Sequence, residues 1–172
     1  MDPRRSVVGG AVFLLVVSVL LVSSGSIGSP EPTVTLENED TVTYRVTAYT
    51  VDNQDVAGFL NFEVTTEDGE QRLVTYQELI WPDGYRNITL VDDGVDSQSF
   101  VVEPNETVSE SVKGWSDGEM TVYILERGPD REHYRSRTVT CEGRGQSHSF
   151  TMRDGGGGSS SSCASGLGWL FR

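Results

Sequence analysis

The stretch Thr41-Val-Thr-Tyr-Arg-Val-Thr-Ala48 decides the fold, because polar and apolar side chains alternate along it without a break. A period of two is typical of a β-strand with one buried face and one face in water. An α-helix would instead repeat its apolar positions every three or four residues. No window of twelve or more residues outside the N-terminus has that spacing. The sequence therefore predicts an all-β protein.

Working outward, the same alternation recurs along most of the chain. Residues 60–65 alternate, and Asp68-Gly69 then turns the chain into residues 73–76, which predicts a hairpin. Residues 120–125 are apolar at both odd and even positions, as expected of a strand covered on both faces. Seven to nine short strands about ten residues apart indicate an antiparallel sandwich of two sheets.

Two motifs resemble the immunoglobulin-like and adhesion-related accessory domains of exported archaeal proteins. They are Leu36-Glu-Asn-Glu-Asp40, which precedes a threonine-rich strand, and the turn Val102-Glu-Pro-Asn-Glu-Thr107. The resemblance covers residues 33–153 and implies a single immunoglobulin-like β-sandwich. In such a core one tryptophan is buried, and Trp81 or Trp115 is the expected one. The two-cysteine framework of antibody domains is absent from the sequence.

The N-terminus carries an export or membrane signal. Arg4 and Arg5 precede sixteen uncharged, mostly apolar residues, Val7–Val22. A bilayer needs about twenty apolar residues and a signal peptide about seven to fifteen, so this length fits either reading. Residues 1–28 are therefore predicted to be a cleaved signal peptide or a membrane anchor. An uncleaved segment over residues 7–27 would place the N-terminus in the cytoplasm and the domain outside, and cleavage would release a secreted protein.

Composition divides the rest of the chain into two parts. Residues 29–154 form the predicted acidic β-sandwich domain, and residues 155–172 form a predicted Gly/Ser-rich tether with a short apolar tail. The apolar tail residues Trp169, Leu170 and Phe171 are too few to span a membrane. They are expected to be disordered, with contact to a bilayer surface or a partner as the alternative.

Charge excludes one class of partner and suggests a habitat. Between Glu31 and Asp154 there are 25 acidic and ten basic residues, a formal charge of about −15. Such a field repels nucleic acid, so no DNA or RNA partner is expected. The chain has twelve arginines and one lysine. This acidic, lysine-poor composition resembles proteins of halophilic archaea, and an ordinary acidic secreted protein is the alternative.

Cys141, His148 and Met152 are the sharpest candidates for chemistry, because blue-copper sites combine these three side-chain types. The Cys-to-His gap is longer than that ligand loop usually has, and the only other histidine, His133, comes shortly before Cys141. The alternative is that His148 and Met152 belong to the inner face of the last strand. The sequence therefore predicts no cofactor and keeps copper as a weak candidate.

Cys141 and Cys163 are the only cysteines, and outside the cell a pair invites a disulfide. Two alternatives remain open at this point. Cys141 fits a buried free thiol, and Cys163 fits an exposed thiol for dimer formation or lipid attachment.

Three further groups are surface candidates. Asp92, Asp93 and Asp96 surround a turn and are weak calcium candidates, although their order does not match an EF-hand loop. Asn87 and Asn105 each begin an Asn-x-Thr sequence and are candidate glycosylation sites. Half of the basic residues of the exported region form a possible docking patch for an acidic partner or a glycan, with pairing to neighbouring carboxylates as the alternative: Arg127, Arg131, Arg135, Arg137 and Arg144.

These features favour a non-enzymatic module of the cell envelope that faces outside and serves adhesion, assembly, or the binding of a partner or ligand. The expected marker is an exposed apolar or aromatic patch on one sheet, with Tyr49, Tyr123 or Trp115 as possible members. The alternatives are a cupredoxin-like copper or thiol redox protein and, more weakly, a surface hydrolase. No nucleophile elbow and no phosphate-binding loop appears in the sequence. Partner identity and oligomeric state do not follow from the sequence.

Overall fold

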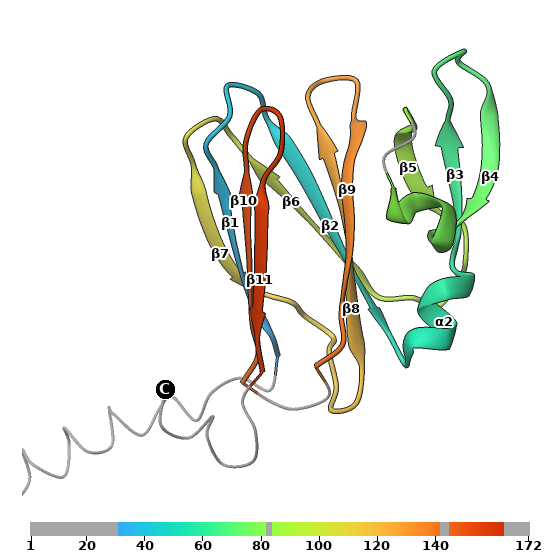
Figure 1. The fold of residues 1–172 in the computed structure, drawn as a ribbon. Helices are drawn as coiled ribbons and strands as arrows, with labels where there is room; N and C mark the ends of the chain where they lie inside the picture. The colour runs from blue at the N-terminus through green and yellow to red at the C-terminus, as the bar shows by residue number, and fades with distance from the viewer. Residues whose placement is uncertain (1–30, 82–83, 142–144, 164–172) are drawn as a thin grey trace, which may run out of the picture.

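The computed structural model describes residues 31–81, 84–141 and 145–163, which form two β-sheets and two short helices (Figure 1). The smaller sheet has the strand order β11 (Gly158–Ser162), β10 (Ser147–Met152), β1 (Thr33–Asn38), β7 (Thr107–Ser111). The larger sheet has the order β4 (Gln71–Thr75), β3 (Asn61–Thr65), β5 (Arg86–Leu90), β9 (Glu132–Val139), β8 (Met120–Arg127), β2 (Tyr44–Val51), β6 (Ser97–Val102). The helices are α2 (Gln54–Phe59) and the 3₁₀ helix η1 (Tyr76–Ile80). The all-β prediction is confirmed.

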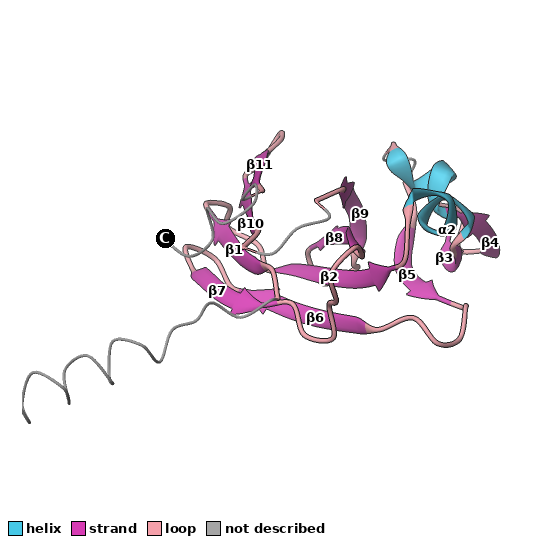
Figure 2. Ribbon diagram, turned by 90° about the horizontal axis from the view of Figure 1, so that it is seen from below, coloured by secondary structure: helices cyan, strands magenta, loops and turns pink. Residues whose placement is uncertain are grey.

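Strands β2 and β8 lie between two hydrophobic cores and contribute side chains to both. Tyr44 and Val46 of β2 face the core beneath the smaller sheet, where they meet β1 and β10. The alternate residues Tyr49 and Val51 of β2 face a second core beside β3, β5 and the helices. Figure 2 shows the smaller sheet and the helices at opposite ends of the molecule, with β2 and β8 between them.

Strand β8 is buried along almost its whole length, which confirms the prediction of a strand covered on both faces. Tyr123 and Leu125 fill the first core, and Val122 and Ile124 fill the second. A strand that is apolar on both parities cannot sit at a sheet surface without exposing half of its side chains to water. The local composition of β8 therefore places it at the centre of the domain.

The smaller sheet contains a parallel pair, which the prediction of antiparallel sheets did not include. Strand β1 pairs in parallel with β10, with Thr33 opposite Ser147 and Leu36 opposite Phe150, and antiparallel with β7. A hairpin can only make antiparallel neighbours. Because β1 and β10 are far apart in the sequence, no hairpin joins them and their relative direction is not constrained to be antiparallel.

The Gly/Ser segment differs from its prediction as a flexible tether. The chain turns at Asp154 and Gly155, and Gly158–Ser162 forms the edge strand β11, which pairs antiparallel with β10. Gly157 passes so close to β10 that an added Cβ would overlap the carbonyl oxygen of Thr151. A glycine is required where one backbone approaches another this closely. Residues 155–162 therefore belong to the sandwich, and its boundary lies beyond Asp154.

Three predicted features lie outside the described residues: the signal or anchor over residues 1–28, Arg144 of the arginine group, and the apolar tail over residues 164–172. Within the described part of the chain, no helix has the length and apolar character needed to cross a bilayer. Of the two tryptophans considered for the core, Trp115 is buried and donates its indole N–H to the carbonyl oxygen of Glu119. Trp81 is 77% exposed.

Candidate functional site

Four large apolar side chains are exposed on the two short helices and the residue that follows η1. They are Val56, Phe59, Ile80 and Trp81, here called the α2–η1 patch. Phe59 is 72% exposed and Trp81 is 77% exposed. Single exposed apolar residues are normal on a protein surface, whereas a contiguous group of them is typical of a site of interaction. The α2–η1 patch is the strongest candidate functional surface among the described residues.

Local capping fixes the helix that carries the first half of this patch. The side chain of Asn53 accepts hydrogen bonds from the backbone N–H groups of Asp55 and Val56, at 3.0 and 3.1 Å, and so begins α2. Within this helix only Ala57 is buried. Because residues one position apart on a helix point in different directions, burial of Ala57 leaves Val56 facing water.

The second half of the patch is held by η1. The backbone N–H of Thr75 donates to the Glu78 carboxylate at 3.0 Å, which fixes the first turn. Tyr76 and Leu79 point into the second core, and Ile80 is left partly exposed. The hydroxyl groups of Tyr76 and Thr138 of β9 are 2.8 Å apart, which fastens η1 to the sheet.

Phe59 lies between two hollows, because it lines both of them. One hollow of about 570 Å³ is bounded by Phe59, Ile80 and Thr138, and a second of about 430 Å³ is bounded by Phe59, Val56 and Val95. Asp55 lines both hollows, and Asp92 and Asp93 line the second. The patch is therefore an apolar surface with an acidic rim.

The aromatic residues suggested for an exposed patch are not part of one. Tyr49 is 5% exposed, Trp115 is 4% exposed and Tyr123 is fully buried. Burial raises the pKa of Tyr49 to about 12 and raises that of Tyr123 further. These three side chains serve the two cores and their immediate surroundings, so that part of the interpretation is wrong.

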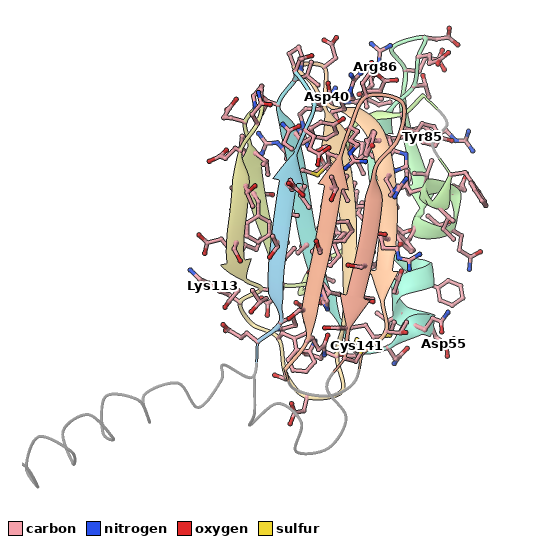
Figure 3. The ribbon with its side chains drawn as sticks, turned by 60° about the vertical axis from the view of Figure 1, so that its left-hand side comes forward. Asp40, Asp55, Tyr85, Arg86, Lys113 and Cys141 are labelled. Atoms are coloured by element: carbon pink, nitrogen blue, oxygen red, sulfur yellow. A yellow bond between two sulfur atoms is a disulfide. The ribbon has the colours of Figure 1, made fainter. Side chains whose placement is uncertain are left out.

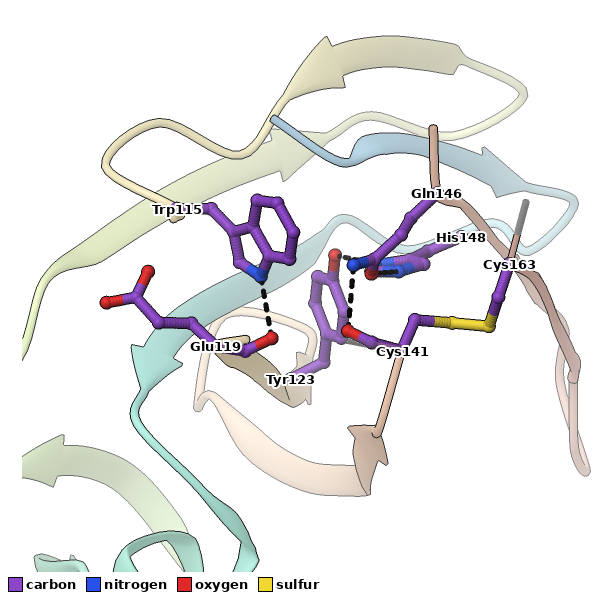
Figure 4. Close-up of a disulfide and its surroundings, with 7 residues drawn as sticks. All are labelled: Trp115, Glu119, Tyr123, Cys141, Gln146, His148 and Cys163. Carbon is purple, nitrogen blue, oxygen red and sulfur yellow. Dashed lines mark hydrogen bonds between the residues drawn. A yellow bond between two sulfur atoms is a disulfide. The ribbon is translucent and has the colours of Figure 1, made fainter. Parts of the chain in front are cut away.

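Cys141 and Cys163 are joined in a disulfide, with their Cα atoms 5.7 Å apart (Figure 4). The bond ties the end of β11 to the segment that follows β9. Neither cysteine is a free thiol in the structure, so the alternatives of a buried thiol and of an exposed thiol for lipid or dimer attachment do not describe this state.

A chain of hydrogen bonds runs from the disulfide into the core and fixes the tautomer of His148. The side-chain N–H of Gln146 donates to the carbonyl oxygen of Cys141 at 2.8 Å. This orients the Gln146 oxygen toward Nε2 of His148, 3.0 Å away, so Nε2 carries the proton. Nδ1 then accepts from the Tyr123 hydroxyl at 2.7 Å. Burial lowers the pKa of His148 to about 4, which keeps the ring neutral.

This arrangement contradicts the copper candidate. The sulfur of Cys141 is in a disulfide and cannot supply the thiolate that a blue-copper site requires. Both ring nitrogens of His148 are engaged by protein groups. Met152 is fully buried in the first core. Cys141, His148 and Met152 are thus structural residues at the inner face of the sandwich.

The arginine group is largely committed to ion pairs. Arg127 contacts the buried carboxylate of Asp40 at 2.9 Å and the exposed carboxylate of Asp154 at 3.1 Å. The Arg127 guanidinium lowers the pKa of Asp40 to about 2. Arg131 contacts the buried carboxylate of Glu126 at 2.8 Å. These two arginines therefore neutralise buried acids and are not available as a docking surface.

The remaining described members of the group differ. The guanidinium of Arg135 lies 5.9 Å from the ring centroid of Tyr134, within the range of a cation–π contact. Arg137 is exposed on β9. Two cations on a nearly balanced segment do not make a basic patch.

The aspartate group does not form a calcium site. Asp92 accepts hydrogen bonds from the backbone N–H and the side-chain amide of Asn61, at 2.6 and 3.1 Å. Asp93 and Asp96 are exposed. In the described part of the chain no group of three His, Cys, Asp or Glu residues is placed to hold a metal ion. Asp92 instead fastens the start of β3.

Both sequon asparagines are exposed, as the glycosylation hypothesis requires. Asn105 follows Pro104 in the turn between β6 and β7, with φ at 60°, and the Glu106 N–H closes that turn on the Glu103 carbonyl oxygen at 3.1 Å. Asn87 lies in β5 with φ at 51°. Asparagine tolerates this left-handed conformation better than most residues.

One polar pair escaped the sequence analysis. Nε2 of His133 lies 2.8 Å from the hydroxyl oxygen of Ser136, and both residues are buried on β9. Among the described residues, Nδ1 of His133 has no hydrogen-bond partner, so no carboxylate of this part of the chain orients the ring as a catalytic base requires. Burial lowers the pKa of His133 to about 4. Nothing in the spacing of one histidine and one serine distinguishes this pair from chance.

Comparison with known proteins identifies the family. A family model described as "Halobacterial Ig domain protein" matches residues 1–172, so the chain belongs to this family. This confirms both the suspected haloarchaeal relationship and the immunoglobulin-like fold class. None of the curated proteins matches the chain.

Two solved structures show a distant likeness. One is titled "Trapped Toxin", with 7% identity and a TM-score of 0.31, over 77% of this chain and 23% of the toxin. The other is the human-specific toxin intermedilysin, with 9% identity and a TM-score of 0.35, over 78% of this chain and 24% of the toxin. The chain spans about a quarter of the length of each structure, and a likeness this weak carries no functional argument.

Proposed function

We propose that this protein is a non-enzymatic module of the cell envelope that faces outside and binds another cell-surface protein through the α2–η1 patch. The observation that carries the proposal is the exposure of Val56, Phe59, Ile80 and Trp81 on a domain whose two cores are otherwise filled. Aromatic side chains such as Phe59 and Trp81 are enriched at the centres of protein interfaces.

The acidic rim defines the chemistry of the partner. Asp55 lines both hollows, and Asp92 and Asp93 line one of them. A complementary surface would be apolar at its centre and basic at its edge. An anionic lipid surface is disfavoured by the formal charge of about −15 between Glu31 and Asp154. The occupant of the patch is therefore a protein surface with lysine or arginine around an apolar centre.

High salt would favour this mode of binding. At molar ionic strength the Debye length is about 3 Å, so repulsion between two acidic proteins is screened beyond direct contact. Salts that are excluded from protein surfaces strengthen apolar burial. The apolar centre of the patch therefore supplies most of the affinity in the habitat that this composition suggests, because exposed ion pairs at the rim contribute less there.

The titratable groups support a non-enzymatic role. The buried acids Asp40 and Glu126 are each engaged by an arginine. Glu126 also accepts from the backbone N–H of Ile88 at 3.0 Å, and burial raises its pKa. These carboxylates stabilise turns and strands and offer no free oxygen to a substrate. The weaker hydrolase alternative finds no support in the His133–Ser136 pair, whose ring has no orienting acid within residues 31–81, 84–141 and 145–163.

The external location has its own test. The intact mass of the protein isolated from its native membranes gives its N-terminus and its modifications in one measurement. A mass that includes residues 1–28 supports an anchored module, and a start near Gly25 shows a cleaved signal. Glycan mass on Asn87 or Asn105 would support exposure outside the cell, and Asn→Gln variants assign it to one site. A full-length, unmodified protein found in the cytosolic fraction contradicts the location.

The binding proposal is tested by placing a photoreactive amino acid at position 59 in living cells. Position 101 is the matched control, because Val101 is 48% exposed but lies on β6, outside the patch. The expected result is one cell-surface protein crosslinked from position 59 and absent from position 101. Purified partner should then bind the wild type at least tenfold more tightly than Phe59→Ser, in molar salt. Equal adducts at both positions, or equal affinities, overturn the proposal.

A further inference from the structure

We infer that Trp169, Leu170 and Phe171 occupy the α2–η1 patch of their own molecule and compete with the external partner. This inference rests on the proposed function of the patch and adds its regulation. Two features of the described residues carry it: the position of the Cys141–Cys163 disulfide, and the chemistry of the hollow beside Phe59.

The disulfide starts the apolar tail close to the hollow. Thr138 lines the hollow with Phe59, and Cys141 follows Thr138 by three residues, an extended reach of about 10 Å. Cys163 is joined to Cys141, with 5.7 Å between their Cα atoms. Cys163 therefore lies within about 16 Å of the hollow's edge by this path. Figure 3 shows Cys141 and Asp55, another lining residue, toward the same end of the molecule.

The spacing after Cys163 matches that distance. Trp169 follows Cys163 by six residues, which span at most about 20 Å when extended. The five intervening residues are Ala-Ser-Gly-Leu-Gly, so small residues predominate between the disulfide and the aromatic group. Trp169 can thus reach the hollow, and the two residues after it can reach further across the patch.

The tail has the chemistry that the patch requires of a partner. Three consecutive large apolar residues are followed by Arg172, the only charged residue after Asp154. The hollow offers Phe59 and Ile80 at its wall and Asp55 at its rim. Burial of the apolar side chains against Phe59 and Ile80, with the arginine beside Asp55, is complementary in both polarity and charge.

An intramolecular occupant is favoured over a second copy of the chain. A segment tethered by a short linker has an effective concentration in the millimolar range at its site. Two copies would each bring a formal charge of about −15 between Glu31 and Asp154, and the rims of both patches are acidic. Repulsion between two such domains is screened in molar salt, so the effective concentration of the tethered tail is what favours it over a second copy.

The inference is tested on the full chain in lipid nanodiscs, with hydrogen exchange of residues 54–60 and 76–81 as the readout. The variant Trp169→Ser, Leu170→Ser, Phe171→Ser removes the apolar tail groups and leaves the disulfide intact. Val101→Ser is the control for loss of an exposed apolar side chain elsewhere. We expect the triple variant to exchange at least fivefold faster in these two segments, with unchanged exchange in β8 and with the control equal to the wild type.

Three outcomes overturn the inference. Exchange that is equal in the triple variant and the wild type shows that the tail does not cover the patch. Protection that the wild type loses on dilution shows that a second copy covers it. Faster exchange in β8 as well shows that the triple variant has lost its fold, and Trp169→Ser alone must then reproduce the local effect or the inference fails. In each case crosslinking from position 59 still decides the proposed function independently, and a correct inference predicts stronger crosslinking to the partner in the triple variant.

Discussion

Nδ1 of His148 lies 2.7 Å from the hydroxyl of Tyr123, and the two aromatic rings meet edge to face. Since Nε2 of His148 donates to Gln146, the ring can accept from Tyr123 only while it is neutral. Protonation of Nδ1 would make the Tyr123 hydroxyl turn to accept this hydrogen bond, and the hydroxyl proton would then lose its acceptor in a buried site. The pair therefore makes the core sensitive to acid.

The first prediction concerns this sensitivity. His148 has a pKa of about 4 in the folded protein and an ordinary value of 6.5 when unfolded, so the unfolded chain binds the extra proton between these values. The stability contribution is complete above pH 6.5 and is lost as the pH falls toward 4. From pH 7 to pH 5 this one residue should reduce the free energy of unfolding by about 2 kcal/mol.

Urea unfolding at constant molar salt measures the effect. His148→Gln should lose about 2 kcal/mol less than the wild type between pH 7 and pH 5. Comparing how steeply the free energy of unfolding falls with pH in the two proteins removes the contribution of the other titratable groups, which both proteins share. His133, whose pKa is also about 4, should leave a residual slope of similar size in the variant. Equal slopes in the two proteins would contradict the assignment.

The second prediction concerns the buried ion pair of Asp40 and Arg127. Asp40→Asn removes the charge that holds Arg127 and should reduce the free energy of unfolding by about 2 kcal/mol, less than for a fully buried pair because Arg127 is partly exposed. Asp154→Asn is the matched control, since Asp154 contacts the same guanidinium but its side chain is 84% exposed. This control should change stability by less than about 0.5 kcal/mol.

The same pair has a defined pH dependence. The pKa of Asp40 is lowered to about 2, first by its hydrogen bond to Arg127. Its contribution is present above pH 3.8 and is lost as the pH falls through 2. The free energy of unfolding should therefore fall more steeply from pH 4 to pH 2 for the wild type than for Asp40→Asn. Parallel curves would show that Asp40 is not the group concerned.

The third prediction concerns Gly157. Gly157→Ala forces a methyl group against the Thr151 carbonyl and should displace β11, with a loss of about 1–3 kcal/mol. Gly158→Ala is a close control, because its added methyl group would meet open space. Amide exchange of residues 158–162 should rise for Gly157→Ala and stay unchanged for Gly158→Ala. Faster exchange in both variants would contradict this explanation, because the Thr151 carbonyl would then not be the reason that β11 is displaced.

The fourth prediction concerns the disulfide. The bond closes a segment with a sequence separation of 22, which is worth about 3 kcal/mol by the loss of chain entropy in the unfolded state. Reduction of the wild type should lower its urea midpoint accordingly. Cys163→Ser should have the midpoint of the reduced wild type and should not respond to reductant. A reduced protein with an unchanged midpoint would show that β11 docking alone sets the stability of this end.

The central strands were predictable because the pattern of apolar residues along each of them fits a buried strand and no other element. Strand β8 is apolar at every position from Val122 to Leu125, and alternation marks β2 clearly. Strand β11 was not predictable, because glycine and serine have low β-propensity and their composition matches a linker. The backbone hydrogen bonds to β10 and the bond from Cys163 to Cys141 hold it in the sheet, and neither is visible in local sequence.

The exposed apolar residues do not lie where the sequence predicted a patch. An exposed apolar patch was expected on a sheet, yet it lies on two short helices that have no helical periodicity to reveal them. Phe59 and Ile80 look like core residues in the sequence, because they adjoin the buried Leu60 and Leu79. The local helical geometry determines which residue of each adjacent pair is buried and which is exposed to water.

The parallel pairing of β1 with β10 has a mechanical consequence. A pull on Thr33 along the strand axis slides β1 past both β10 and β7, so its hydrogen bonds are loaded together in shear and do not open one at a time. On the side of β10, hydrogen bonds along the whole of β1, from Thr33 to Asn38, resist that motion. A domain held at β1 and at its helices would therefore carry tension between these two points without unravelling from its first strand.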